Sequence, residues 1–102
     1  MISEEERMVT MGRLYDFYGQ LLTAHRQRIY EMSVYEDLSL AEIAEREGIS
    51  RQAVHDLLRR TTKILEQYEE KLQMMRRFDA IRAIASSMDD RELAERIIKE
   101  LD

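Results

Sequence analysis

The sequence predicts an all-α protein in which a helix-turn-helix is followed by a long helical extension at the C-terminus. The 102 residues include no proline, only three glycines and many strong helix formers. Apolar residues recur at spacings of three and four through most of the chain. The stretch at residues 38–57 carries the capping and turn residues of two short helices joined by a tight turn. These three observations together favour helices throughout.

The helix-turn-helix is predicted from its caps and its turn. Ser39 is a good helix N-cap, and Glu42 three residues later completes a capping box. Gly48 stands where the first helix must end, because glycine adopts the left-handed conformation at little cost. Ser50 then caps the second helix. The contact between the two helices is expected to come from the apolar positions Ile43, Ala44, Ile49, Val54 and Leu57.

Two further helices are expected before this motif. The first spans residues 4–22 with Ser3 as its cap, and the second runs from Thr23 to about Tyr35. The first turn of the second helix holds a small basic cluster formed by His25, Arg26 and Arg28. Because positive charge at a helix N-terminus opposes the helix dipole, this cluster is interpreted either as a solvated surface or as a phosphate contact.

The helix that begins at Arg51 has no obvious end before Ser86, because this stretch has no proline, no glycine and no strong cap. A helix of roughly 35 residues would be about 50 Å long, more than one side of a small domain can cover. Either it breaks near residues 73–77 and folds back, or a second chain covers its distal half. So long a periodic helix favours coiled-coil-like association, and a homodimer is therefore predicted.

The last helix is expected over Asp90–Leu101. The chain is thereby divided into a helix-turn-helix core at residues 1–70 and a C-terminal helical extension at residues 71–102. The extension is expected to belong to the same domain and to the dimer interface.

The charge of the chain changes sign at the turn of the motif. Residues 36–47 carry five acidic side chains against one arginine, whereas residues 48–63 carry four basic side chains against one aspartate. The second helix is thus the basic one, as expected of a helix that approaches phosphates. The net charge of the whole chain is −5, which counts against strong non-specific binding to DNA.

Candidate nucleic-acid-binding residues follow from the way helix-turn-helix motifs dock. Side chains near the N-terminus of the second helix reach base edges, and flanking groups hold phosphates. The predicted set is Ser50, Arg51, Gln52, His55, Arg59, Arg60 and Lys63.

Within this set, Arg51 is expected to read guanine and Gln52 to read adenine. Asp56 is expected to repel phosphate unless it accepts a hydrogen bond from cytosine or pairs with Arg60. The alternative interpretation is a purely structural core whose exposed face binds protein, which would make the chain an interaction adaptor without DNA binding.

No catalytic, cofactor or metal site is predicted. The chain has no cysteine and two histidines, and neither histidine lies in a pattern typical of a nucleophilic or zinc site. His55 and Asp56 are adjacent, so their side chains are expected to diverge on a helix. No apolar run is long enough to span a membrane and no signal peptide is visible, so a cytoplasmic, non-enzymatic protein is expected.

The motif resembles the helix-turn-helix of region 4 of bacterial sigma factors. The residues that carry this resemblance are Leu38-Ser39-Leu40-Ala41-Glu42-Ile43-Ala44-Glu45 and Gly48-Ile49-Ser50-Arg51-Gln52-Ala53-Val54. The wider pattern is similar to the YlxM family of small sigma-region-4-like proteins. That pattern adds Leu14-Tyr15-Asp16-Phe17-Tyr18, Leu21-Leu22-Thr23, Arg59-Arg60-Thr61 and Lys63-Ile64-Leu65-Glu66-Gln67-Tyr68-Glu69-Glu70-Lys71-Leu72.

The resemblance covers roughly residues 8–80 of the chain. It implies a DNA-binding regulator or an accessory factor of the signal recognition particle pathway, in contact with the RNA or protein of that particle, rather than a sigma factor. Glu47 departs from the family pattern, in which the residue before the turn glycine is usually apolar. A glutamate at this position is expected to loosen the packing of the first motif helix.

Overall fold

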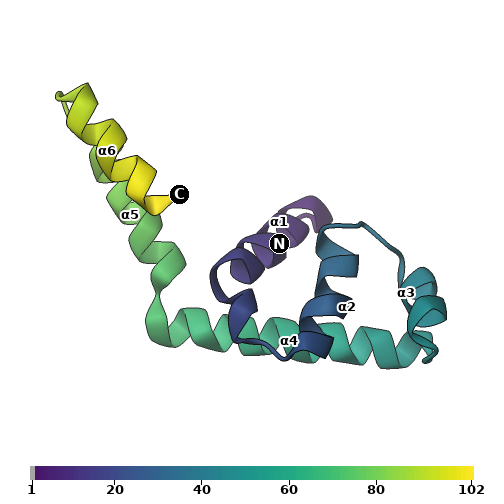
Figure 1. Ribbon diagram of the computed structural model, residues 1–102. Coiled ribbons are helices and arrows are strands. Elements are labelled where there is room, and N and C mark those ends of the chain that lie inside the picture. The colour runs from purple at the N-terminus through teal and green to yellow at the C-terminus, as the bar shows by residue number, and fades with distance from the viewer. Residues whose placement is uncertain (1) are drawn as a thin grey trace.

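The structure is a computed structural model that describes residues 2–102, and every regular element in that range is a helix (Figure 1). The all-α class that the sequence predicts is confirmed. The elements in chain order are α1 (Glu4–Tyr18), the short 3-10 helix η1 (Gly19–Leu21), α2 (Ala24–Val34), α3 (Leu40–Glu47), α4 (Arg51–Leu72), α5 (Met74–Ser86) and α6 (Arg91–Leu101). The molecule is elongated, with extents of 54 × 27 × 24 Å.

Helix α4 is the element on which the core is built. Its buried side chains are Val54, Leu58, Thr61 and Leu65, which recur at spacings of four and three and so share one face. Helices α1, α2 and α3 pack against this helix (Figure 1). The largest fully buried side chains come from three of these helices and are Tyr30, Ile29, Ile43, Leu65, Val54 and Thr61. This packing fixes which face of α4 is turned toward solvent.

Thr61 is expected to lower the stability of that buried stripe, because its hydroxyl oxygen is buried without a hydrogen-bond partner in the described structure. Replacing Thr61 with valine should raise the free energy of unfolding by about 1 kcal/mol, since an unpaired buried hydroxyl is costly. Chemical denaturation followed by circular dichroism measures this change.

The neighbouring Thr62 provides the matched control for that measurement. Its hydroxyl lies 2.9 Å from the Tyr30 hydroxyl and donates to the Leu58 carbonyl at 2.9 Å, so Thr62→Val should destabilise the protein instead. If Thr61→Val also proved destabilising, the Thr61 hydroxyl would have to be hydrogen-bonded in solution, for example to the carbonyl one turn back.

The first helix is shorter than the sequence predicts, whereas the second agrees with the prediction. The α-helical part of the first helix ends at Tyr18 rather than at residue 22. The Gln27 side chain donates to the carbonyls of Gly19 (3.0 Å) and Leu22 (3.1 Å), so α2 supplies hydrogen-bond donors to backbone carbonyls beyond the end of α1. A Cβ on Gly19 would lie 2.8 Å from the ring of Tyr15, so only glycine fits this contact. The second helix has Thr23 as its N-cap and Tyr35 as its C-cap, so the predicted helix from Thr23 to about Tyr35 is confirmed.

The helix-turn-helix at α3 and α4 has the capping that the sequence predicts. Both hydrogen bonds of the capping box join Ser39 and Glu42, at 3.1 and 3.0 Å. Gly48 has a φ of +69°, and the Ser50 hydroxyl accepts the Ala53 N–H at 3.0 Å. Of the apolar positions expected to join the two helices, Ile43, Ala44 and Val54 are buried, whereas Leu57 is half-buried and Ile49 is exposed.

The long helix predicted from Arg51 to Ser86 is not continuous. It ends at Leu72 and α5 begins at Met74, so the predicted alternative of a break near residues 73–77 is confirmed. However, α5 does not fold back along α4: it leaves α4 at a steep angle, and α6 instead returns along α5 (Figure 1). We call α5 and α6 the C-terminal hairpin. The division into a core at residues 1–70 and an extension at residues 71–102 stays a prediction.

The joint between α4 and α5 is stabilised by one side chain of α4 and one of α1. Gln73 adopts the left-handed conformation with φ 55° and ψ 32°, and its own side chain does not cap α5. The Glu69 carboxylate instead accepts the backbone N–H groups of Met75 (3.0 Å) and Arg76 (3.3 Å). The Tyr18 hydroxyl donates to Glu69 at 2.5 Å and accepts the N–H of Met74 at 3.0 Å. Glu69 and Tyr18 thus satisfy the first backbone donors of α5.

None of the helices described is both long enough and apolar enough to cross a membrane.

Candidate nucleic-acid interface

The candidate site is the outer face of α4, opposite its buried stripe. All the predicted binding residues are exposed there or at the cap of the helix: Ser50, Arg51, Gln52, His55, Arg59, Arg60 and Lys63. Gln52, Asp56, Arg59 and Lys63 follow one another at spacings of four, three and four, so they form a row along the centre of this face. Their exposure is compatible with contact to a large ligand such as a duplex.

The basic side chains of this face are not neutralised within the molecule. Among the described residues, no carboxylate forms an ion pair with Arg51, Arg59, Arg60 or Lys63. Four arginines on other helices do form ion pairs, namely Arg13, Arg28, Arg46 and Arg82. The first two-thirds of α4 therefore present positive charge to solvent, although the chain as a whole is acidic.

Two cations from other helices extend this charge to both flanks of α4. On one flank, Arg26 of α2 lines a hollow together with Asp56 and Arg60. On the other flank, Arg7 of α1 lines a groove of about 430 Å³ whose other charged lining residues are Arg59, Lys63 and the acidic Glu66.

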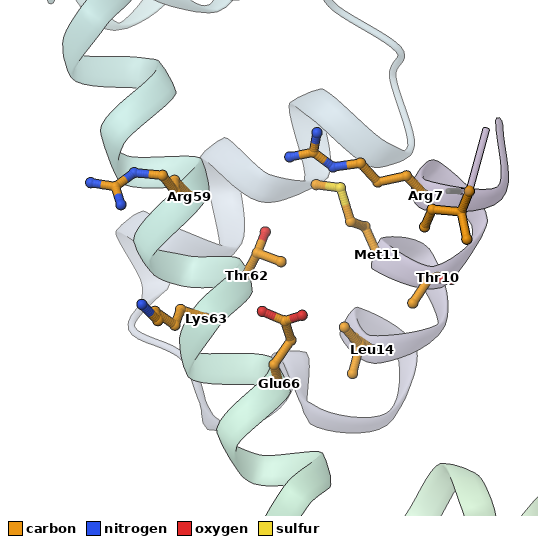
Figure 2. Close-up of a pocket in the computed structure, with 9 residues that line it drawn as sticks. Arg7, Thr10, Met11, Leu14, Arg59, Thr62, Lys63 and Glu66 are labelled. Carbon is orange, nitrogen blue, oxygen red and sulfur yellow. The ribbon is translucent and has the colours of Figure 1, made fainter. Parts of the chain in front are cut away.

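Figure 2 shows how the charged side chains of this second groove lie. Arg7 reaches from α1 toward α4, whereas the charged ends of Arg59 and Lys63 point away from α1, onto the outer side of α4. The floor of the groove is lined by the apolar side chains of Met11 and Leu14. Sequence reasoning left the role of Arg26 open and missed Arg7, because no sequence signal indicates that the first turn of α1 lies beside α4.

The other two members of the basic cluster in α2, His25 and Arg28, contact a carboxylate of α3. Arg28 donates to the Glu47 carboxylate at 2.9 Å, and the His25 ring lies 3.7 Å from the same carboxylate. The side chain of Glu47 is only 12% exposed, and its hydrogen bond with Arg28 lowers its pKa below the usual value. The glutamate that departs from the family pattern therefore ties the end of α3 to α2.

The single acid in the row, Asp56, is engaged along its own helix. It accepts a hydrogen bond from the Gln52 amide at 3.1 Å, and the His55 Nδ1 lies 3.6 Å from the same oxygen. The expected divergence of His55 and Asp56 is wrong: adjacent positions are about 100° apart, but both side chains are long enough to meet over the helix surface. Of the two alternatives that the sequence leaves open for Asp56, the pair with Arg60 is not found among the described residues, and the hydrogen bond to cytosine stays a prediction.

Comparison with known proteins assigns the family. The family described as "Putative helix-turn-helix protein, YlxM / p13 like" (UPF0122) matches residues 5–102. The chain belongs to the YlxM/p13-like family. The resemblance to YlxM that the sequence indicates is therefore confirmed, and the match extends beyond residues 8–80 to include the C-terminal hairpin.

Several members of the YlxM/p13-like family are similar to this chain over most of its length. A UPF0122 protein of Geobacillus kaustophilus is 45% identical over 85 residues, which cover 83% of this chain and 77% of the relative. YlxM of Bacillus subtilis is 36% identical over 104 aligned residues, which cover 95% and 94% of the two chains. A UPF0122 protein of Streptococcus agalactiae is 51% identical over 71 residues, which cover 70% of this chain and 64% of the relative.

Proposed function

We propose that this YlxM/p13-like protein binds nucleic acid through the outer face of α4. The observation that carries the proposal is a set of exposed cations on a well-capped second motif helix, none of which forms an ion pair with a described residue: Arg51, Arg59, Arg60 and Lys63. Arg51 reads guanine and Gln52 reads adenine, once Gln52 exchanges its hydrogen bond to Asp56 for one to the base. Arg59, Arg60 and Lys63 hold phosphates. Ser50 and His55 lie at the same end of the helix and complete the contact surface.

The proposed biological role is regulatory and non-enzymatic. The protein acts in the cytoplasm as a homodimer, with duplex DNA as its ligand, on a helix-turn-helix similar to region 4 of sigma factors. The RNA of the signal recognition particle is the alternative ligand, in which case the protein is an accessory factor of that pathway and contacts its proteins as well. Membership of a helix-turn-helix family supports the nucleic-acid role.

The second candidate function is a protein-interaction adaptor that uses the same scaffold without nucleic acid. It is favoured by the net charge of −5 and by Asp56, which places negative charge in the middle of the row on α4. Exposed acids on α3, including Glu42 and Glu45, add to this charge beside the motif.

A salt titration separates the two functions. Fluorescence anisotropy is measured with labelled duplex DNA and, separately, with a labelled RNA hairpin, from low to physiological ionic strength. Binding to nucleic acid should weaken steeply with salt, since phosphate contacts release counterions. Arg51→Ala and Arg59→Ala should each lower the affinity about three- to tenfold, and loss of the Arg59 phosphate contact should reduce the salt slope by about one.

The matched control is Arg96→Ala. Arg96 is an exposed arginine on α6, without an ion pair to a described residue and outside the proposed interface, so its loss should leave the affinity nearly unchanged. Absence of binding to either ligand at low salt would reject the nucleic-acid proposal and favour the adaptor. Equal losses in all three variants would show that only the overall charge of the protein matters.

A further inference from the structure

The C-terminal hairpin projects away from the core (Figure 1). At its base it contacts α1, where the rings of Phe17 and Phe78 meet edge to face with centroids 5.0 Å apart and Arg13 pairs with Asp79 at 2.6 Å. The two helices of the hairpin pack tightly on each other at Ala85 and Ala94, which are 1% and 0% exposed. These contacts cover one side of the hairpin and leave the rest open.

The open side carries exposed branched apolar residues. Ile81, Ile84 and Leu93 are 40%, 65% and 42% exposed, and Ile97 is half-buried. Successive residues of a helix are rotated by about 100° around its axis. The side chains of Ile81 and Ile84 therefore lie about 40° and 100° around α5 from Ala85, both in the same direction.

On α6, Leu93 and Ile97 are rotated from the Ala94 contact point by about 100° and 60° in the same sense. In an antiparallel helix pair, positions rotated in the same sense from the contact lie on the same face. The four side chains therefore form one apolar surface, which we call the hairpin face. Asp79 is rotated in the opposite sense and pairs with α1, so the hairpin face is turned away from the core.

The two arms of the hairpin differ in charge. Within α5, three arginines stand against one aspartate, a net charge of +2. Helix α6 itself is neutral, but with the acids at its two ends, Asp89, Asp90 and Asp102, the second arm at residues 89–102 has a net charge of −3. A surface that combines a positive and a negative half is complementary to a rotated copy of itself.

We propose that the hairpin face packs on the same face of a second copy of this chain, with α5 of each copy against α6 of the other. Two two-fold axes can join such faces. An axis across the helices places α5 on α5, which brings like charges together. An axis along the hairpin places α5 on the second arm of the other copy, which joins arms of opposite net charge. With either axis every neighbouring pair of helices is antiparallel, as in a four-helix bundle.

The dimer itself does not depend on the proposed function. Only its use in nucleic-acid binding, which follows, rests on that function. A two-fold axis along the hairpin leaves both cores at the same end of the bundle, so two α4 faces are carried by one unit. Helix-turn-helix dimers use two recognition helices to bind two half-sites. The dimer itself is tested without nucleic acid, so its failure and the failure of nucleic-acid binding are distinguishable.

The first test is the oligomeric state by size-exclusion chromatography with light scattering. The wild-type protein should be a dimer at low micromolar concentration, and Ile84→Glu should raise the dissociation constant by at least about tenfold because it places a charge in the apolar contact. Val9→Glu is the matched control, since Val9 is 63% exposed on α1 and lies outside the hairpin. A monomeric wild-type protein, or an Ile84→Glu variant that is folded by circular dichroism and still dimeric, would overturn the proposal.

The second test distinguishes the two arrangements. The chain has no cysteine, so introduced thiols can be cross-linked selectively. Ile84 lies two residues before the end of α5 and Leu93 two residues after the start of α6, which places them at the same level of the hairpin. A mixture of Ile84→Cys and Leu93→Cys chains, allowed to exchange and then oxidised with glutathione disulfide, should give a covalent heterodimer. A covalent dimer formed between two Ile84→Cys chains would contradict the proposed arrangement. So would the absence of any covalent dimer.

Discussion

Replacement of Leu65 with alanine is expected to lower the free energy of unfolding by about 3 kcal/mol, because the truncation leaves a cavity in a packed core. Leu65 is 0% exposed and belongs to the cluster that joins α1 and α4. In a domain of this size, such a loss corresponds to a decrease of more than about 10 °C in the melting temperature. Urea denaturation at pH 7 measures the change directly.

Leu72→Ala is the control for this prediction. Leu72 lies on the same helix but is 48% exposed, so the same change of side chain should cost less than about 1 kcal/mol there. Equal losses at the two positions would mean that Leu65 is not buried as the structure describes, or that Leu72 is covered in solution. Because Leu65 lies on the face of α4 opposite the proposed interface, the folded variant should keep its affinity for nucleic acid.

The helix-turn-helix was predictable because its signals act over a few residues. Ser39 and Glu42 cap α3, and Gly48 and Ser50 form the turn, without help from the rest of the chain. Where a helix end depends on a distant side chain, the local sequence carries no such signal. Just past the end of α1, the Gly19 carbonyl accepts a hydrogen bond from Gln27 of the next helix.

The break after α4 is the clearest example of a boundary that the sequence alone could not place. Nothing at Gln73 indicates a left-handed residue, and its conformation is compatible with the fold because Glu69 and Tyr18 satisfy the donors of α5. Tyr18 is far away along the chain, so its part in the joint is visible only in three dimensions.

The candidate site shows the same division between local and distant information. Arg59 and Lys63 could be assigned to the outer face of α4 from helical spacing alone. The flanking positions of Arg7 and Arg26 depend on how α1 and α2 pack beside α4. The hydrogen bond from Gln52 to Asp56 depends on side-chain conformation, which spacing does not determine.

Replacement of Glu69 with glutamine is expected to lower the free energy of unfolding at pH 7 by about 1–2 kcal/mol, because charge-assisted hydrogen bonds at the joint become neutral ones. Partial burial raises the pKa of Glu69, but hydrogen bonds from Tyr18 and from the backbone of Met75 and Arg76 outweigh it and hold the pKa below the usual 4.5. A carboxylate with a lowered pKa in the folded state contributes stability above the unfolded pKa, and this contribution is lost as the pH falls through the folded pKa.

The pH dependence isolates the contribution of Glu69 from that of other acids. Wild-type stability should fall in acid for several reasons, since the pKa values of Glu42, Glu47 and Asp79 are also lowered by hydrogen bonds. The difference between wild type and Glu69→Gln should be largest near pH 7, begin to shrink as the pH approaches 4.5 and disappear as the pH falls through the lowered pKa of Glu69, because both side chains are uncharged below it. Glu70→Gln, at an exposed neighbour, should give a small difference at every pH.

A Glu69→Gln difference that stays constant into acid would mean that shape rather than charge holds the joint. A difference near zero throughout would mean that Glu69 does not cap α5, and the direction of the hairpin would then have to be set by the contacts of Phe78 and Asp79 with α1.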